Sequence, residues 1–550
     1  NAIFTNDTVA QCVTNFTDFG NLEIDNSNGV TFKSDVVVDD TLKLTDGVMT
    51  MASGTNLVAN TKTGTLTNLR FLRDIDYSSF GPGWIMLSSP LSTTYNDLFS
   101  AITTQGYTGA DLTTTNPDSL QPSVLTYKED FTNCSPNCTD NQRWRTLSDE
   151  ANSIPTGAGQ FVYVFGDITG DARYNNTSPI TLDISGAENT GTNGEVDFGV
   201  TFTTASDTSD YRRGWNLVGN PYAATIDWDD GNWTKTRVDN AIYIWDPAQG
   251  KYLQWNGITG SYDINGGLIS PFQAFWIHAN GLDPTLKVQQ ESKTVGGDFK
   301  GKRINDHESA PTIELSMTND SLTASTYFSF TKGGSLQKDR YDAYRLLPFD
   351  SEKYASLYSL LGNGNQVVIN NLPLKFGRPV KIPIEASFVN KNTTTKEKFS
   401  IEWPEIKNVP RGWTIMLEDR QRNSKINMQS QQSYEVELTS QGSGSLKKAK
   451  TATDADTVRL SSSNGPQSTL RTVVSKSKNR KARFTLVIDP GDNTDVPQKY
   501  KLYDNYPNPF NPTTTFTVQL QKERQVSLKV YNSLGREVAT LHNGRLSAGE

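Results

Sequence analysis

The chain has 550 residues, of which 20% are charged, with a formal net charge of -8. This length predicts about three to five domains. A mildly acidic chain offers no electrostatic reason to bind nucleic acid, and no run of about 18 apolar residues is present to span a bilayer as a helix. Thr, Ser, Asn, Gly and Val are abundant and aromatics make up 10%, which is typical of strands and tight turns, so we predict an all-β protein.

Residues 20–60 carry a regular apolar rhythm. Ile24, Val30, Val36, Leu42 and Val48 lie six positions apart, separated by turn signals such as Asn-Gly and Asp-Gly. Short strands that bend about every six residues are typical of a parallel β-solenoid, whose coils stack their inward apolar side chains. We therefore predict a β-solenoid-like segment over residues 1–65. An ordinary β-meander is the alternative.

An internal repeat follows, and each copy opens with a Gly-Trp strand that ends in proline. The first copy opens at 83–90 and the second at 214–221, and both continue through an aromatic strand and a Trp-containing hairpin. Each copy closes with a Gln-aromatic strand, at 159–164 and at 272–277. Alternating apolar residues indicate half-buried strands, and the proline fits a strand end. We predict two related β modules, in tandem or packed face to face, over 66–185 and 186–298.

Residues 299–498 are predicted to form a β-sandwich. About seven strand-like runs occur at the spacing that such a fold requires. The stretch at about 441–480 is rich in Ser, Lys, Thr and Gly and almost lacks aromatics, so we expect a disordered insertion there. The predicted strands are 312–317, 327–330, 366–369, 380–384, 414–417, 434–438 and 483–488.

The last segment, 499–550, combines a proline-rich entry with a hairpin pattern. Three prolines within 507–512 hold the entry extended and block helix formation. Val526, Leu528 and Val530 then alternate along one strand, and 532–535 is a turn. This pattern predicts a small antiparallel unit.

The same segment resembles the type A C-terminal sorting domain of type IX secretion system cargo, found in Bacteroidetes and related phyla. The resemblance covers about the last 50 residues. Family members continue for a few more strands and a short basic tail, whereas this sequence stops at Glu550, so we expect a truncated, Ig-like sorting domain. The residues that carry the motif are Tyr506, Pro507, Asn508, Pro509, Phe510, Asn511, Pro512, Leu534 and Gly535.

This resemblance implies recognition by the type IX secretion machinery and a location outside the cell or at its outer surface. Because Asn1 is not a start residue, we expect the chain to begin after a cleavage site. Short Asp-Ser/Thr-apolar motifs are similar to the O-glycosylation motif of the same phylum. They imply glycans at Thr8, Thr41, Ser119, Ser321 and Thr457.

Three cysteines are present. Cys134 and Cys138 lie in Cys-Ser-Pro-Asn-Cys, and in an exported chain we predict a disulfide between them, with two free thiols as the alternative. Cys12 is left over, either as a buried thiol or as a link to another chain.

The sequence offers little sign of catalysis. It has only three histidines and no Gly-x-Ser-x-Gly, His-Glu-x-x-His or phosphate-loop motif, so we predict no catalytic residues and no obligatory cofactor. Two acidic stretches are candidate calcium sites or else solvated turns, through Asp167, Asp171, Asp227 and Asp229. Three tryptophans either stack on sugar rings or form a core, namely Trp228, Trp233 and Trp255.

We therefore expect a non-catalytic extracellular surface protein with a structural or adhesive role. Open solenoid ends and sheet edges can pair between chains, which allows assembly into a sheath, lattice or filament. The expected partner is another copy of the chain or a cell-surface polysaccharide. The alternative is a secreted hydrolase or carbohydrate-binding protein, because a carboxylate pair is compatible with the composition.

Overall fold

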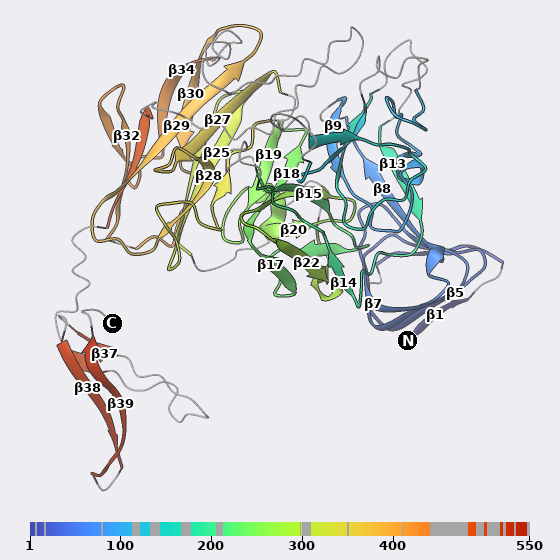
Figure 1. The fold of residues 1–550 in the computed structure, drawn as a ribbon, viewed down its shortest axis with the longest axis horizontal. Helices are drawn as coiled ribbons and strands as arrows, with labels where there is room; N and C mark the ends of the chain where they lie inside the picture. The colour runs from blue at the N-terminus through green and yellow to red at the C-terminus, as the bar shows by residue number, and fades with distance from the viewer. Residues whose placement is uncertain are drawn as a thin grey trace. The chain divides into compact units, whose positions relative to one another are not determined.

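The structure is a computed structural model that describes the chain except residues 6–7, 16–17, 79–80, 113–121, 132–142, 167–177, 205–212, 298, 300–309, 349–350, 411, 441–481, 491–499, 503–517, 521–523, 533–534 and 547–550. Within the described residues the fold is all-β, as predicted, with one short α-helix, α1 (Tyr95–Phe99) (Figure 1). The chain divides into two compact units. The first comprises Asn1–Leu374, Ile382–Val409 and Leu417–Leu486, and the second Lys375–Lys381, Pro410–Met416 and Val487–Glu550.

The first unit begins with the predicted solenoid. One parallel sheet contains β1 (Ala2–Thr5), β3 (Asp18–Asp25), β5 (Val36–Asp46) and β7 (Leu57–Gly64). The second contains β2 (Gln11–Val13), β4 (Val30–Phe32), β6 (Met49–Met51) and β8 (Leu69–Ile75), and β13 (Ile180–Ser185) closes it by antiparallel pairing with β8.

The repeat of the solenoid is longer than the predicted six-residue beat. Val30 pairs with Met49 and Met49 with Leu69, so each coil takes 19 or 20 residues and contributes one strand to each sheet. Leu22, Phe32 and Leu42 point inward and are at most 1% exposed, whereas Val48 is 39% exposed. Leu22, Phe32 and Leu42 therefore belong to the solenoid core, and Val48 lies outside it.

The Gly-Trp repeat folds into two four-stranded sheets with the same strand order. The first sheet has the order β11-β10-β12-β9 and the second the order β19-β18-β21-β15. Their strands are β9 (Gly83–Leu87), β10 (Val124–Tyr127), β11 (Trp144–Thr146) and β12 (Gln160–Val164), matched by β15 (Trp215–Gly219), β18 (Val238–Asp246), β19 (Lys251–Trp255) and β21 (Ala274–Ala279).

The two sheets meet through reciprocal backbone hydrogen bonds. The Ser88 N–H donates to the Phe272 carbonyl at 2.8 Å, and the Gly219 N–H donates to the Gly157 carbonyl at 2.9 Å. Each bond joins the end of a Gly-Trp strand to the segment before the last strand of the other copy. The two copies therefore contact each other through equivalent segments.

Two small sheets complete the second module. β22 (Thr285–Gln289) lies between β14 (Glu195–Asp197) and β17 (Trp233–Thr236). β16 (Thr225–Asp227) lies between β20 (Leu268–Ile269) and β23 (Lys293–Thr294). These strands carry several of the polar groups described below.

The following β unit is built around one long sheet. Its order is β33-β32-β35-β29-β27-β28-β25-β24-β30-β34, with β26 (Ala343–Tyr344) beside β28 and β31 (Ile406–Lys407) beside β24. All seven predicted strands are present. The additional strands are β26, β27, β30, β31 and β33. The bounds are β24 (Thr312–Thr318), β25 (Thr323–Thr331), β27 (Lys353–Leu360), β28 (Gln366–Pro373), β29 (Val380–Asn390), β30 (Lys396–Glu402), β32 (Thr414–Asp419), β33 (Ser424–Asn427), β34 (Ser433–Thr439) and β35 (Phe484–Asp489).

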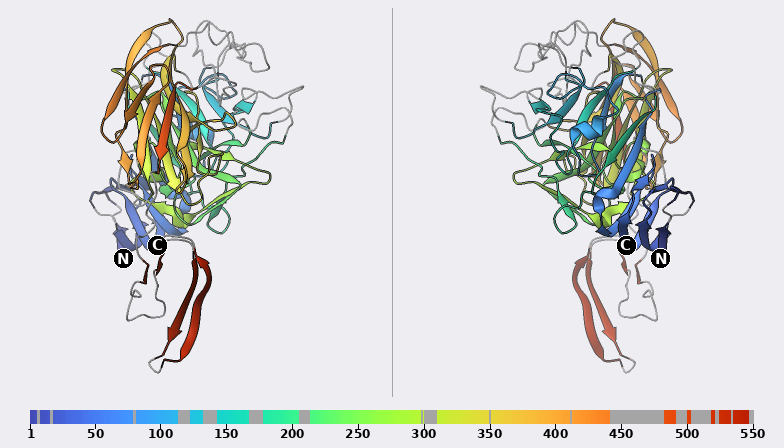
Figure 2. Two further views of the ribbon diagram at one scale, coloured as in Figure 1. Left: turned by 90° about the vertical axis from the view of Figure 1, so that its left-hand side faces the viewer. Right: turned by 90° about the vertical axis from the view of Figure 1, so that its right-hand side faces the viewer.

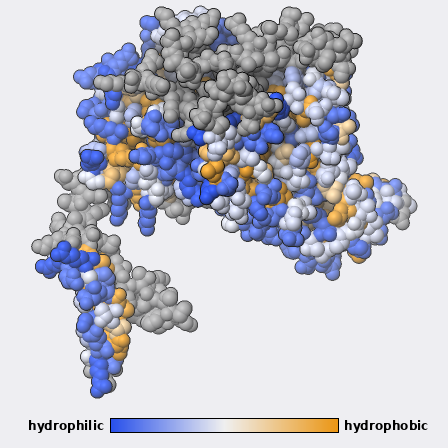
Figure 3. All heavy atoms as spheres, viewed as in Figure 1, coloured by the Kyte–Doolittle hydropathy of each residue, from blue (hydrophilic) through white to orange (hydrophobic). Residues whose placement is uncertain are grey.

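In the second unit, β36 (Lys501–Leu502) pairs with β37 (Val518–Gln519), and β38 (Arg524–Tyr531) forms a hairpin with β39 (Glu537–Leu546), visible in Figure 2. Gly535 lies in the turn with φ 75°, which favours glycine. Apolar residues line one side of this hairpin in Figure 3, and Tyr531, Val538 and Leu541 are 48–59% exposed. The predicted strand pair and turn are thus present.

Candidate functional site

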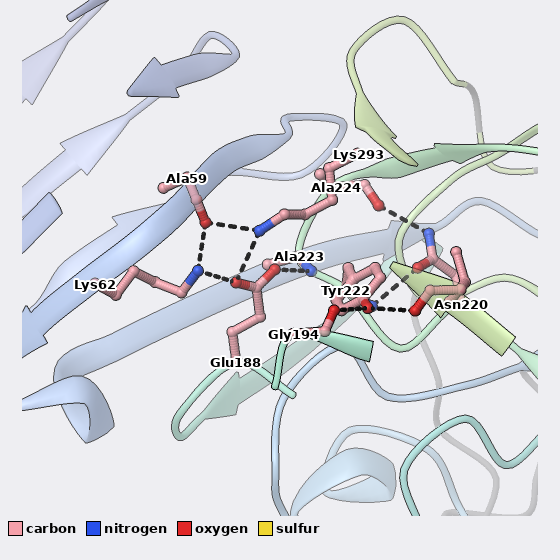
Figure 4. Close-up of polar contacts among 10 residues, drawn as sticks. Ala59, Lys62, Glu188, Gly194, Asn220, Tyr222, Ala223, Ala224 and Lys293 are labelled. Atoms are coloured by element: carbon pink, nitrogen blue, oxygen red, sulfur yellow. Dashed lines mark hydrogen bonds and ion pairs between the residues drawn. The ribbon is translucent and has the colours of Figure 1, made fainter. Parts of the chain in front are cut away.

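A deeply buried ion cluster lies between the solenoid and the second module (Figure 4). Lys62 comes from β7, Glu188 from the loop after β13, and Lys293 from β23. Glu188 Oε2 lies 2.6 Å from Lys62 Nζ and 3.4 Å from Lys293 Nζ. The Ala223 N–H donates to Glu188 Oε1 at 2.8 Å, and both ammonium groups donate to the Ala59 carbonyl.

The two ammonium groups of this cluster offset the burial of its carboxylate. Burial by itself raises the pKa of Glu188, but Lys293 and Lys62 outweigh it, so the pKa of the carboxyl lies below its usual value. Burial lowers the pKa of Lys293 to about 8. The three side chains are between 0% and 6% exposed, so no substrate can reach them. We call Lys62, Glu188 and Lys293 the ionic latch, because these buried charges connect the solenoid to the second module.

Neutral hydrogen bonds extend this latch over the last coil of the solenoid. The Leu57 N–H donates to the Ala223 carbonyl at 2.8 Å, and Asn56 Oδ1 accepts from the backbone and hydroxyl of Thr225. Behind them, Asn220 Nδ2 donates to the Ala224 carbonyl (Figure 4). The Tyr222 hydroxyl donates to the Val288 carbonyl at 2.9 Å. The β7 end of the solenoid is therefore capped by the second module.

A second buried centre joins the second module to the segment that precedes β26. Asp239 Oδ2 lies 2.8 Å from both His278 Nδ1 and Lys338 Nζ, and Asp239 Oδ1 accepts from Asn280 Nδ2 at 2.7 Å. Burial alone raises the pKa of Asp239, but the charge of Lys338 and the hydrogen bond from His278 lower it to about 2. Asp239 is thus a buried anion with all its partners in place.

The Asp239–His278 pair is two thirds of a catalytic triad, but its surroundings do not support catalysis. His278 is 3% exposed, and its Nε2 has no hydrogen-bond partner among the described residues. The rings of Trp215 and Tyr344 pack against the imidazole at centroid distances of 5.0 and 5.1 Å. In the sequence, the only sign of this pair is a histidine in the otherwise apolar β21.

The loop after Lys338 carries the buried carboxylate of Asp342 beside the half-buried Asp339. Asp342 Oδ1 accepts from the Asn371 N–H at 2.6 Å, and Asp342 Oδ2 accepts from the Asp339 N–H at 2.8 Å. Burial, and then the charge of Asp339, raise the pKa of Asp342 to about 8. Near neutral pH this group therefore holds a proton in the folded state.

Stability is expected to fall as pH rises from about 4 to 8, because folded Asp342 keeps its proton over this range and the unfolded side chain does not. Asp342→Asn should flatten this slope, since the amide does not titrate. Urea midpoints at pH 5 and pH 8.5 measure the effect, with the exposed Asp320→Asn as the control. Equal slopes in all three proteins would contradict the assignment.

The predicted calcium residues that are described do not converge. Asp227 Oδ1 accepts from the Asp229 N–H at 2.8 Å, and Asp229 Oδ2 accepts from Trp255 Nε1 at 2.7 Å. In the described part of the chain no three Asp, Glu, His or Cys side chains could hold a metal together. Asp167 and Asp171 lie outside the described residues. The described acids serve local hydrogen bonds.

The tryptophans proposed for glycan stacking are mainly core residues. Trp228 is 0% and Trp255 8% exposed, so neither ring presents a face to a sugar, which corrects that interpretation for both. Trp233 is half-buried and stacks on Phe198, with ring centroids 5.9 Å apart and planes at 7°. The alternation along the strands is compatible with burial of either face of the sheet. The low exposure of Trp228 and Trp255 places both side chains in the core.

The remaining predicted positions are spread over the chain. Thr8 and Ser321 are exposed and Thr41 is half-buried. Cys12 is exposed, which corrects the buried-thiol alternative. Outside the described residues lie Ser119, Thr457, Cys134, Cys138, Tyr506, Pro507, Asn508, Pro509, Phe510, Asn511, Pro512 and Leu534.

One polar cavity of about 660 Å³ opens beside β14 and β22. Its lining includes Glu195, Asp197, Lys287 and Glu291. Lys287 Nζ lies 3.0 Å from Glu195 and 3.7 Å from Asp197, so the charges partly compensate each other. The cavity has the size and polarity to accept a sugar residue.

None of the helices in the described residues has the length and apolar character needed to cross a membrane. In comparisons with known proteins, no family model, no curated protein and no solved structure matches the chain.

Proposed function

We propose that this chain is a non-catalytic extracellular surface protein with a structural or adhesive role, exported by the type IX secretion system. The observation that carries the structural role is the ionic latch of Lys62, Glu188 and Lys293. Its charges are fully enclosed and are used to hold two β units together. Asp239 does the same between the second module and the segment before β26. Charged side chains buried in this way stabilise the contacts between β units. They are not accessible to a substrate.

The export proposal is supported by the resemblance of the last segment to sorting domains. The β38–β39 hairpin adds a second line of support, because its strands expose Tyr531, Val538 and Leu541. A two-stranded hairpin with an uncovered apolar side is a suitable recognition element, since an edge strand can pair with a receptor.

Deleting residues 500–550 is expected to abolish delivery to the cell exterior in a host with a working type IX system. Fractionation and surface proteolysis measure the location. Replacing Pro507, Pro509 and Pro512 with alanine is the milder variant, and a deletion of 441–480 is the control for loss of an equally polar segment. Unchanged delivery of the 500–550 deletion would refute the export role.

Self-assembly is part of the same proposal. β1 is the edge strand of its sheet, and Ile3 on this strand is 61% exposed. Unpaired edge groups with apolar side chains are templates for pairing with another chain. Size-exclusion chromatography and negative-stain images over a concentration series decide this point, and a protein that stays monomeric throughout would oppose it.

Carbohydrate binding is the second candidate function, favoured by the polar cavity beside β14 and β22. Calorimetric titration with surface polysaccharide fragments, using wild type and Glu195→Gln, separates it from a purely structural role.

A further inference from the structure

We propose that Lys235 and Asn240 become joined, after folding, by an intramolecular isopeptide bond. Lys235 lies on β17 and Asn240 on β18, on either side of the corner at Arg237, which has φ 54°. Lys235 Nζ donates to Asn240 Oδ1 at 3.3 Å. The amine is thus already in contact with the carboxamide that it would attack.

The carboxamide of Asn240 is held in one orientation. Its Nδ2 donates to the Asn256 carbonyl at 2.8 Å, which directs Oδ1 toward the lysine. The backbone of Asn240 is fixed as well, because its N–H donates to the Arg340 carbonyl and its carbonyl accepts from Trp228 Nε1. Asn240 is 9% exposed, so water competes poorly at this site. Such positioning of two reacting groups greatly raises their effective concentration.

The amine of Lys235 lies in an aromatic environment. Its Nζ is 3.7 Å from the centroid of the buried Trp228 ring and 5.6 Å from that of Trp233. It also donates to the Trp228 carbonyl at 2.5 Å. Burial lowers the pKa of Lys235 to about 8, although the charge of Asp229 opposes this shift. A larger share of the neutral, nucleophilic amine is therefore present at neutral pH than for an exposed lysine.

Asp229 is placed to move the proton. Trp255 Nε1 fixes its Oδ2 at 2.7 Å. Asp229 Oδ1 and Asn240 Nδ2 flank the same residue, Gly257: a Cβ there would lie 3.0 Å from the first atom and 2.3 Å from the second. Gly257, with φ +84°, leaves the space in which the carboxylate and the leaving nitrogen approach each other.

The reaction balances without an oxidant, reductant or further reactant. Asp229 accepts a proton from the Lys235 ammonium, and the amine lone pair attacks Asn240 Cγ. The new Nζ–Cγ bond forms, the Cγ–Nδ2 bond breaks, and Nδ2 leaves as an ammonium ion. It carries its own two hydrogens, the proton that Asp229 returns and one hydrogen from the attacking nitrogen. The new amide N–H keeps the Trp228 carbonyl as its acceptor. The product is a ring that closes the β17–β18 corner.

Mass spectrometry of the purified full-length protein tests the proposal. The intact mass should be lower by about 17 Da, the mass of one ammonia. Trypsin should not cleave after Lys235, and peptides 214–237 and 238–251 should be recovered as one cross-linked pair. Lys235→Arg keeps the positive charge and should restore the full mass, and Asp229→Asn should slow or stop the loss of ammonia. Lys287→Arg on neighbouring β22 is the matched control and should keep the cross-link.

Succinimide formation at an Asn-Gly sequence, such as Asn256-Gly257, also releases ammonia, so the peptide map is essential. A succinimide leaves 214–235 and 238–251 as separate peptides and persists in Lys235→Arg. Wild-type protein of unreduced mass, or a loss of ammonia that survives in Lys235→Arg, overturns the proposal. Circular dichroism of each variant tests whether it is folded, so that the absence of the cross-link can be distinguished from unfolding.

Discussion

Glu188→Ala is expected to destabilise the protein by about 3–5 kcal/mol, because it leaves two buried ammonium groups without their counter-ion. Lys62 and Lys293 are 6% and 1% exposed, and both contact the same carboxylate oxygen. Water cannot replace that carboxylate in a closed interface. The urea midpoint of the transition that separates the solenoid from the second module, followed by tryptophan fluorescence, measures the loss.

Two further variants give this experiment its controls. Glu23→Ala removes the partner of Lys43, whose side chain is 52% exposed, and should destabilise the protein far less than Glu188→Ala because solvent screens this pair. Glu188→Leu combined with Lys62→Met and Lys293→Met replaces the cluster with apolar groups of similar size. It should recover most of the stability, since a buried ionic cluster and a well-packed apolar one are often equivalent. A cost for Glu188→Ala no larger than that for Glu23→Ala would contradict the latch.

Trp276→Ala is expected to cost about 3–5 kcal/mol, because it opens a cavity in the aromatic core. Trp276 is 0% exposed, and its ring lies 4.9 Å from Tyr127 and 5.6 Å from Trp144 of the first module, between ring centroids. It also meets Trp215 of its own module at 6.4 Å. One side chain therefore joins the facing sheets of both copies of the repeat.

A matched pair of variants distinguishes core packing from simple loss of an aromatic residue. Trp276→Phe keeps a ring in the same place and should cost clearly less than Trp276→Ala. Trp233→Ala removes a half-buried tryptophan stacked on Phe198, away from this core, and should cost less again. Thermal unfolding followed by near-ultraviolet circular dichroism reports on the packing. Equal costs for Trp276→Ala and Trp233→Ala would show that the rings do not form a common core.

The aromatic core extends beyond the two copies of the repeat. Tyr344 from β26 and Tyr358 from β27 belong to the same buried cluster as Trp84, Trp215 and Trp276. Together with the ionic latch, this packing links the solenoid, the two modules and the long sheet inside the first unit. Such continuous packing suits a protein whose proposed role is structural.

Much of the fold follows from local sequence patterns. Period-two alternation located all seven predicted strands of the long sheet, and the repeated Gly-Trp pattern matches two sheets of one strand order. β27 was not predicted because Lys353–Leu360 mixes polar and apolar residues on both faces. β30 was not predicted because Phe399 and Ile401 are the only apolar residues in Lys396–Glu402. The solenoid was recognised but its period was not, since each coil contains two strands that belong to different sheets.

The sequence by itself determined the all-β class, the strand pattern and the repeat, because alternation and turn residues act between near neighbours. Only the tertiary structure decided which face of Trp228 and Trp255 is covered, and which acids become buried ions. Glu188 looks like an ordinary loop acid in the sequence, and its partner Lys293 lies 105 residues away. Burial and charge pairing depend on segments brought together by folding, so no local pattern encodes them.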